Sequence, residues 1–242
     1  MSKISRRQLL RQTALTGSAA LVSWIHPQAS MAATSESTRN AHASEDFVYF
    51  TQPESAFVDA AVARLIPTDE LGPGAREAHV TLFIDHQLAG PYGRAERWYM
   101  LGPWATGTKE QGYQLKFTPA QLYRAAIVEI DNYCRQTLSK RIFAELDSTT
   151  QDKTLHDLEN GKIALSGAPP KDFFAMLLQN TIEGFLSDPM YGGNRNFVGW
   201  KLVGFPGPRY NYIDEIRHFG APYSQPTVGL MGRDGSIMMR KG

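Results

Sequence analysis

Apolar residues recur every three or four positions in several stretches of this chain, which is the spacing of one face of an α-helix. The first stretch covers residues 54–66 and stops at Pro67, and the second covers residues 76–88. Both patterns predict amphipathic helices, because a proline commonly follows a helix and the apolar face repeats regularly. Residues 90–116 combine glycine with aromatic side chains and show no helical period, which predicts an ordered loop.

The longest helix is predicted from Pro119 to Leu138. Thr118 is a favourable N-cap residue, and proline fits the first helical position because it has no N–H to donate. The apolar stripe of this segment consists of Leu122, Ala126, Ile130, Tyr133, Cys134 and Leu138. The length of this stripe makes the segment the clearest helix in the sequence.

Two more helices are predicted in the second half of the chain. One is capped by Thr149 or Thr150 and runs through Leu158, and the other begins at Pro170 and ends near Asp188. The core positions of the latter are Phe173, Phe174, Leu177, Leu178, Thr181 and Phe185. Together these segments predict an all-α fold with a single helical domain.

The composition changes after residue 188. The last 55 residues contain ten glycines and five prolines, which leave little room for regular elements. Apolar side chains are nevertheless scattered through this part of the chain, at Tyr191, Phe197, Trp200, Leu202, Phe205, Tyr210 and Tyr212. They must be buried over the helices of the same chain or against another protein. We therefore expect a long, irregular, Gly/Pro-rich C-terminal arm.

Composition and charge narrow the classes of function. The chain has 242 residues, of which 42% are hydrophobic, and a formal net charge of +1. The hydrophobic fraction excludes a disordered chain, and the balanced charge argues against a nucleic-acid-binding protein. The single cysteine, Cys134, excludes an intrachain disulfide and any four-cysteine metal site. Because Cys134 lies on an apolar helix stripe, we expect it to be buried and inert.

The N-terminus has the features of an export signal. A basic start that includes Arg6 and Arg7 precedes an uncharged stretch, residues 13–25, and small residues that end at Ala32. This order is typical of a cleaved secretory signal, and the paired arginines indicate the twin-arginine type, so residues 1–32 are interpreted as a signal peptide. A membrane anchor is disfavoured, because thirteen residues are fewer than the roughly 20 that span a bilayer.

The signal bears on function because the twin-arginine route exports proteins that are already folded. The residues between the signal and the first helix, 33–46, are polar and predict a flexible linker. Folded export suits a protein that carries a cofactor inserted in the cytoplasm, or a protein whose partner carries one. The two cases differ in whether this chain contains catalytic, cofactor-binding or metal-binding residues of its own.

No such residues are predicted. His79 and His86 fall on one predicted helix seven positions apart, whereas ligand pairs on a helix stand three or four apart. Asp69 and Glu70 are adjacent acids of a kind that is common on protein surfaces. With no metal site and no catalytic group predicted, the export signal indicates that the cofactor belongs to a partner.

The glycine pair in Gly192-Gly193-Asn194 does not form a phosphate cradle either. It matches neither the dinucleotide-binding pattern nor the P-loop pattern. Its glycines are interpreted instead as backbone positions that require a positive φ.

Several blocks of the sequence resemble, in the same order, the gluconate 2-dehydrogenase subunit 3 family. The blocks are LIPTDELGPGA (65–75), FIDHQLAG (83–90), QGYQ (111–114), TPAQLYR (118–124), EGFLSDP (183–189), YGGN (191–194) and GWKL (199–202) with GFPG (204–207). The resemblance covers a helical domain from residue 47 to residue 208. Residues 209–242 fall outside it and are treated as a C-terminal extension whose role the blocks leave open.

The resemblance implies a non-catalytic small subunit of a periplasmic, membrane-associated sugar or sugar-acid dehydrogenase. In such complexes a flavoprotein of the glucose–methanol–choline (GMC) type holds FAD and the active site. A multihaem cytochrome c subunit takes the electrons and associates the complex with the inner membrane. The small subunit stabilises the flavoprotein and carries it, folded, through the twin-arginine translocase. Neither the substrate nor the stoichiometry is given by these blocks.

The resemblance and the aromatic residues together predict a partner interface. We expect the loop at 191–194 and the arm at 200–206 to contact the large subunit, through Tyr191, Gly192, Gly193, Asn194, Trp200, Phe205 and Pro206. Packing of the same residues over the chain's own helices is the alternative. Two other classes stay open, a periplasmic structural module and a free-standing exported enzyme or metal-binding protein. A metal site of the latter would use Asp69, Glu70, His79 and His86.

Overall fold

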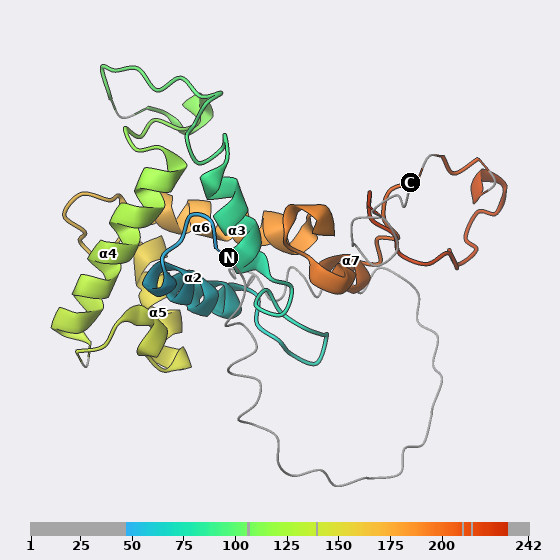
Figure 1. Cartoon of the computed structure of the whole chain (residues 1–242), viewed down its shortest axis with the longest axis horizontal. Helices are drawn as coiled ribbons and strands as arrows, with labels where there is room; N and C mark the ends of the chain where they lie inside the picture. Colours follow the sequence, from blue (N-terminus) through green and yellow to red (C-terminus); the bar gives the residue numbers. More distant parts are fainter. Residues whose placement is uncertain (1–46, 106, 139, 210, 214, 232–242) are drawn as a thin grey trace, which may run out of the picture. The chain divides into compact units, whose positions relative to one another are not determined.

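The computed structural model describes residues 47–105, 107–138, 140–209, 211–213 and 215–231, and this part of the chain is helical, with no β-strand. The α-helices are α2 (Gln52–Leu65), α3 (Val80–Ala89), α4 (Pro119–Thr137), α5 (Ser148–Glu159), α6 (Pro170–Leu186) and α7 (Val198–Val203) (Figure 1). Short 3₁₀ turns lie at Lys109–Gln111, Phe143–Glu145, Pro189–Tyr191, Arg195–Phe197 and Glu215–Arg217. The all-α prediction is confirmed for these residues, whereas the predicted signal (1–32, with Arg6 and Arg7) and linker (33–46) lie outside them.

The helix N-termini are set by local side chains. At α4, the Thr118 hydroxyl accepts from the Gln121 N–H, and the Gln121 side chain accepts from the Thr118 N–H, a capping box that satisfies two orphan donors. The cap of α5 is Asp147, whose carboxylate accepts from the Thr150 N–H at 3.0 Å. The prediction that Thr149 or Thr150 is that cap is therefore wrong, because the acidic side chain two to three positions earlier reaches the free N–H.

Helix α3 starts four residues later than the hydrophobic pattern predicts. Residues 75–79 form turns, and His79, with φ 58°, is the left-handed residue immediately before the helix. The prediction that His79 and His86 share one helix is therefore wrong. The apolar residues of the turn, Ala75 and Ala78, are fully buried, so they continue the pattern without continuing the helix.

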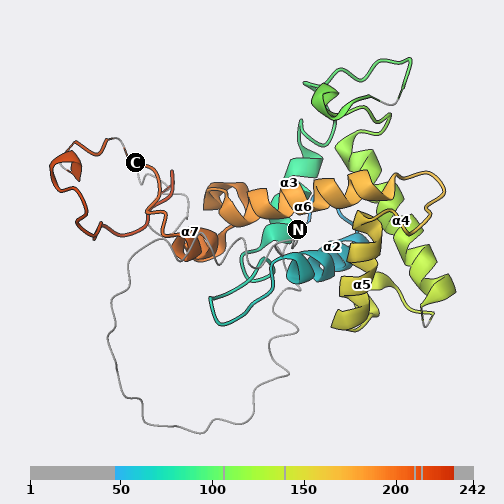
Figure 2. The same ribbon diagram turned by 180° about the vertical axis from the view of Figure 1, so that it is seen from behind.

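Helix α6 is the central element of the described domain. It packs against α2, α3, α4 and α5, and Figure 2 shows it crossing α3 and α4. Its apolar positions explain this place, because Phe173, Leu177 and Phe185 are almost completely buried. Burial of an apolar helix stripe on this scale is the main stabilising contribution in a domain of this size.

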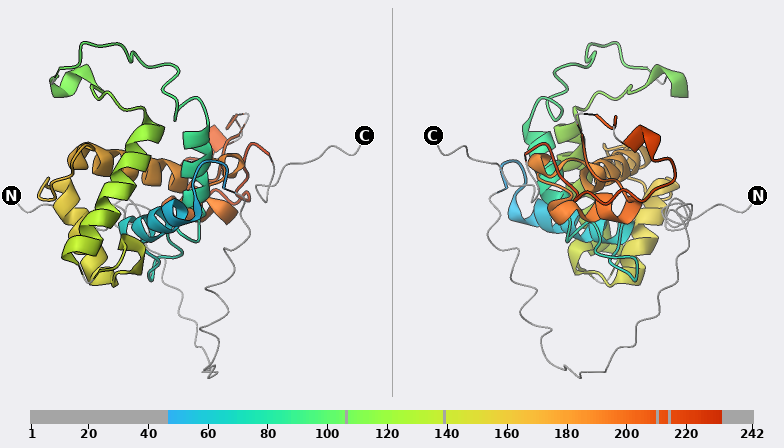
Figure 3. Two further views of the ribbon diagram at one scale, coloured as in Figure 1. Left: turned by 60° about the vertical axis from the view of Figure 1, so that its left-hand side comes forward. Right: turned by 90° about the vertical axis from the view of Figure 1, so that its right-hand side faces the viewer.

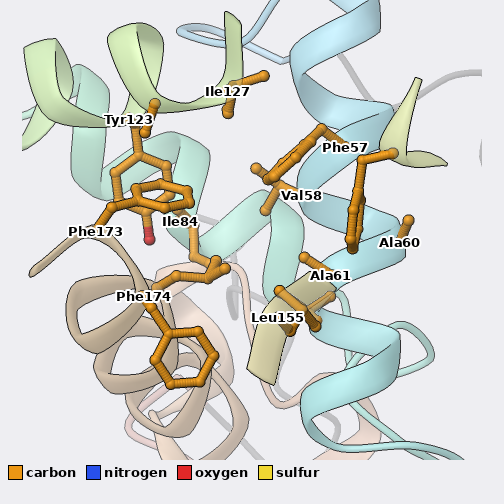
Figure 4. Packing of buried hydrophobic residues seen from close by; sticks show 14 of the residues in the cluster. Phe57, Val58, Ala60, Ala61, Ile84, Tyr123, Ile127, Leu155, Phe173 and Phe174 are labelled. Carbon is orange, nitrogen blue, oxygen red and sulfur yellow. The ribbon is translucent and has the colours of Figure 1, made fainter. Parts of the chain in front are cut away.

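The hydrophobic core is rich in aromatic side chains. The centroid of the Phe57 ring on α2 lies 4.7 Å from that of Phe143 and 6.3 Å from that of Phe173. Tyr123 of α4 meets Phe173 edge-on at 5.4 Å, and Figure 4 shows Phe57, Tyr123 and Phe173 in the core. These edge-on and tilted contacts are the favoured geometries for aromatic rings. The predicted core of α4 and α6 is confirmed, although Leu178, Tyr133 and Leu138 are only partly buried.

A buried carboxylate ties the segment before α2 to α3. Asp85 is fully buried and accepts hydrogen bonds from the N–H groups of Val48, Tyr49 and Phe50 at 2.7–2.9 Å. Three backbone donors are a strong set of partners for a carboxyl group, which explains how an acid is accommodated in this buried position. Asp85 therefore anchors residues 48–50, near the start of the described part of the chain, to α3.

The loop between α3 and α4 extends beyond the helix ends, as Figure 3 shows. Its aromatic residues cluster, because the rings of Tyr92 and Trp98 lie 5.6 Å apart and those of Trp98 and Tyr113 lie 4.7 Å apart.

In the part of the chain that the structure describes, no helix is both long enough and apolar enough to cross a membrane.

Candidate partner interface

The segment that follows α6 is organised by Asn194, which is fully buried. Its Nδ2 donates to the Ser187 carbonyl at 2.7 Å, and its Oδ1 accepts from the Gly199 N–H at 2.8 Å. Asn194 has a φ of 49°, a left-handed conformation that asparagine adopts at lower cost than most residues. One side chain therefore connects the end of α6 to the first turn of α7.

The neighbouring glycines are required for two different reasons. Gly192 has a φ of 99°, so the predicted need for a positive φ is confirmed at this position. Gly193 is not in that region, and the prediction is wrong there. A Cβ on Gly193 would lie 2.2 Å from the Gly184 carbonyl oxygen, so this glycine is needed because two backbones approach closely.

Trp200 packs within the chain. Only 6% of it is exposed, its Nε1 donates to the Leu186 carbonyl at 2.7 Å, and its ring stacks on that of Phe197. Phe205 meets the Trp200 ring edge-on at 4.9 Å and is 42% exposed. The buried Trp200 ring therefore packs against Phe205, which is partly exposed to solvent. The contact of these residues with a partner stays a prediction.

Tyr191 lies at an apolar groove between α3 and α6. The side chain is 47% exposed, and the groove has a volume of about 490 Å³. Its lining consists of Phe83, Gln87, Ile182, Glu183, Leu186, Ser187 and Tyr191. Of the predicted interface residues, Tyr191 and Phe205 are exposed, Gly192 and Pro206 are half-buried, and Gly193, Asn194 and Trp200 are buried.

Asp188 attaches the C-terminal extension to this region. One carboxylate oxygen accepts from the Met190 N–H at 3.0 Å, and the other accepts from the Leu230 N–H at 2.7 Å. Farther out, the Arg209 guanidinium donates to the Tyr223 hydroxyl at 2.7 Å and to the Pro226 carbonyl at 2.6 Å. The described residues between 209 and 226 thus form a loop that is closed at its base.

A second, larger cavity lies between the α3–α4 loop and α6, with a volume of about 1070 Å³. The loop contributes aromatic residues, among them Trp98, Trp104 and Tyr113, and α6 contributes Asp172 and Glu183. The sequence did not predict this cavity. Two acids eleven positions apart on a helix carry no signal until the facing loop is known.

The floor of this cavity is fixed by a hydrogen-bond chain. The Tyr92 hydroxyl donates to the Asn180 Oδ1 at 3.1 Å, and the Asn180 Nδ2 donates to the Tyr123 hydroxyl at 3.0 Å. Burial raises the pKa of Tyr123 and of Tyr92, so both hydroxyls stay protonated over the physiological range. These two hydrogen bonds therefore link the loop, α6 and α4.

The residues of the hypothetical metal site do not converge. Asp69 lies in a tight turn with Gly72, Glu70 is in the same turn, and His79 lies beside the Arg195 guanidinium at 2.7 Å. His86 lies on α3, near Gly192. Among the described residues, no group of three or more histidine, cysteine or acidic side chains could hold a metal ion.

Cys134 is fully buried on the inner face of α4, as its place on the apolar stripe predicts. Burial is the largest of the effects that raise the pKa of its thiol to about 12. The thiolate is the reactive form of cysteine, and it is negligibly populated at neutral pH. The prediction of a buried thiol is confirmed, and the raised pKa supports the prediction that the thiol is inert.

These features describe a helical protein in which polar side chains fix the backbone, Tyr191 lines a groove, and aromatic residues of the α3–α4 loop line a cavity. A sequence model of the family named gluconate 2-dehydrogenase subunit 3 matches residues 52–207, and the chain belongs to this family. No curated protein and no solved structure matches the chain. The predicted family is therefore confirmed, and its match ends just before the predicted extension at 209.

Proposed function

We propose that this chain is the small, non-catalytic subunit of a periplasmic, FAD-dependent dehydrogenase complex of the gluconate 2-dehydrogenase type. The observation that carries the proposal is the family match over residues 52–207, because the family is named as a subunit of that enzyme. In this proposal FAD and the active site belong to a GMC-type large subunit. A multihaem cytochrome c subunit supplies haem c and the association with the inner membrane.

The exposed aromatics support a binding role for this chain. Tyr191 and Phe205 are about half exposed, and the neighbouring Asn194 and Trp200 hold the local backbone through part-buried hydrogen bonds. Aromatic side chains on rigid backbone make good interface anchors, because little conformational freedom is lost when they are buried. We propose that they contact the large subunit, and that Trp200 positions Phe205 for this contact.

The proposed export role depends on the first 32 residues. The signal with Arg6 and Arg7 would take the small subunit, and the folded flavoprotein bound to it, to the twin-arginine translocase. This arrangement explains a folded-export signal on a chain for which no cofactor motif is predicted. Replacement of both arginines by lysine should leave the precursor and the flavoprotein in the cytoplasm. Normal export of both would contradict the carrier role.

The proposal is tested by gentle purification of the tagged full chain from its native host. We expect flavin and haem absorbance to co-purify with two larger polypeptides. Such a preparation would also allow a substrate screen across sugars, polyols and sugar acids. A colourless, single-polypeptide preparation would overturn the stable-complex form of the proposal.

The interface is tested by Tyr191→Ala with Phe205→Ala, and Val128→Ala on α4 serves as the matched control because Val128 is also exposed. Loss of aromatic anchors at an interface costs about 2 kcal/mol or more, so we expect the dissociation constant for the flavoprotein to rise at least about tenfold and less flavoprotein to be retained at concentrations near that constant. The control should retain the wild-type amount. Equal retention by both variants would remove Tyr191 and Phe205 from the interface.

A further inference from the structure

The cavity beneath the α3–α4 loop is larger than a small ligand needs. Its volume of about 1070 Å³ lies at or above the upper end of typical small-molecule pockets, which is about 1,000 Å³. It is open to solvent along the loop, where Trp104 is 43% exposed. These dimensions suit an elongated segment of another chain better than a compact ligand.

The wall that α6 forms is acidic and long. Asp172 and Glu183 both line the cavity and are exposed, and the Gln179 amide lies between them and donates to the Glu183 Oε1 at 2.7 Å. Eleven residues of α-helix correspond to about 16 Å along the axis. An extended peptide covers that distance in about five residues.

The opposite wall is aromatic. Trp98, Trp104 and Tyr113 line the cavity from the loop, and among the described lining residues the one cationic side chain is Lys116. The Lys116 Nζ lies 5.4 Å from the centre of the Phe117 ring. Rings that face carboxylates suit a guanidinium, because arginine stacks on aromatic faces and pairs with carboxylates. They disfavour an acidic ligand, which the two carboxylates would repel.

We propose that this cavity binds an extended, arginine- or lysine-bearing segment of the partner subunit, with two basic residues about five positions apart. One basic side chain pairs with Asp172 and the other with Glu183, and at least one of them stacks on the aromatic wall. This inference rests on the proposed function for the identity of the partner. The charge and spacing of the segment follow from the cavity alone.

The first test places a photo-crosslinking benzoylphenylalanine at position 104 or at position 128 of the full chain in its native complex. Position 128 is the control, because Val128 is exposed on α4 and does not line the cavity. We expect position 104, and not 128, to give an adduct with a partner peptide that contains two basic residues in the stated spacing. An adduct with a peptide lacking basic residues would overturn the proposal. So would an adduct with residues 1–46 or 232–242 of this chain, or no adduct while flavin still co-purifies.

The second test needs no partner and therefore separates this inference from the proposed function. A fluorescein-labelled ten-residue peptide with two arginines five positions apart is titrated against the purified full chain, with anisotropy as the readout. We expect Asp172→Asn with Glu183→Gln to weaken binding at least tenfold, and Asp152→Asn, a surface acid on α5, to leave it unchanged. Binding that is equal in the wild type and the double variant would overturn the inference. Missing flavin in the purified complex would overturn the proposed function instead.

Discussion

The helical core and the segment after α6 are held together in different ways. In the core, α2 to α6 bury apolar stripes against one another, and each stripe consists of many residues. In the segment from 187 to 231, Phe197 and Trp200 are buried against each other, but the backbone turns are fixed by a few polar side chains that bind backbone groups. Asn194 connects α6 to α7, and Asp188 and Arg209 close the extension.

The core is therefore stabilised by many interchangeable contacts, whereas the segment after α6 depends on a few individual residues. A helix stripe keeps most of its buried area when one residue changes, whereas a backbone turn that one side chain holds loses its geometry with that side chain. The segment that depends on single residues is also the one that exposes Tyr191 and Phe205. We therefore expect substitutions in this segment to weaken partner binding while they leave the stability of the core almost unchanged.

The largest loss of stability is expected from the core. Phe173 is fully buried against Phe57 and Tyr123, and Phe173→Ala should lower the free energy of unfolding by about 3–5 kcal/mol. Urea denaturation followed by circular dichroism measures this. Val128→Ala, at an exposed position, should stay within about 0.5 kcal/mol of the wild type. A loss below about 1 kcal/mol for Phe173→Ala would contradict the packing described here.

The next effect tests dependence on a single polar residue. Asn194→Ala leaves the Gly199 N–H and the Ser187 carbonyl without their partner and should cost about 2 kcal/mol. The loss should be local, with faster hydrogen exchange at Gly199 and altered Trp200 fluorescence while the helices persist. Asn194→Asp retains the acceptor for Gly199 but sets an acceptor oxygen against the Ser187 carbonyl in a fully buried position, so it should lower stability at least as much as Asn194→Ala. Uniform destabilisation of the core by Asn194→Ala would show that the two regions unfold together.

The same contrast explains what the sequence could predict. Periodic apolar residues identified α2, α4 and α6, because one face of a helix repeats along the chain and needs no knowledge of its partner. The predicted starts of α5 and α3 are wrong, because a neighbouring side chain or turn takes the position before the helix. Asp147 replaces Thr149 or Thr150 as the cap of α5, and His79 ends a turn rather than belonging to α3.

The candidate site was less predictable. The scattered aromatics indicated that the segment after α6 is structured, but α7 and the burial of Trp200 depend on Asn194, whose partners are seven residues before it and five after it. Asp188 bonds to Leu230, 42 positions away. Such contacts leave no periodic trace, so the sequence named Asn194 as an interface residue and missed its structural role.

A smaller effect is expected at Asp188. Asp188→Ala removes the acceptor of the Leu230 N–H and of the Met190 N–H, and should cost about 1–2 kcal/mol, largely in the extension. Limited proteolysis should then cut within 209–231 faster than in the wild type, while the helices remain resistant. Asp152→Asn, which changes a surface pair with Arg64, is the matched control and should not alter the cleavage pattern. Unchanged cleavage in Asp188→Ala would show that other contacts hold the extension.

The smallest effect concerns a single polar residue within the core. Hydrogen bonds from Thr51 and Arg124 outweigh burial and lower the pKa of Glu54 below its ordinary value of 4.5. Because the folded-state pKa is the lower one, Glu54 contributes stability above the ordinary value and loses it as the pH falls through the lowered pKa. The stability advantage of the wild type over Glu54→Gln should therefore be constant at neutral pH and shrink from about pH 5 downward. Urea midpoints at a series of pH values measure it, and an advantage that grows on acidification would contradict the assigned partners. The Glu54→Gln variant should keep its helices folded at neutral pH, because α2 retains its apolar stripe. The turn at Asn194 depends on one side chain and has no such set of remaining contacts.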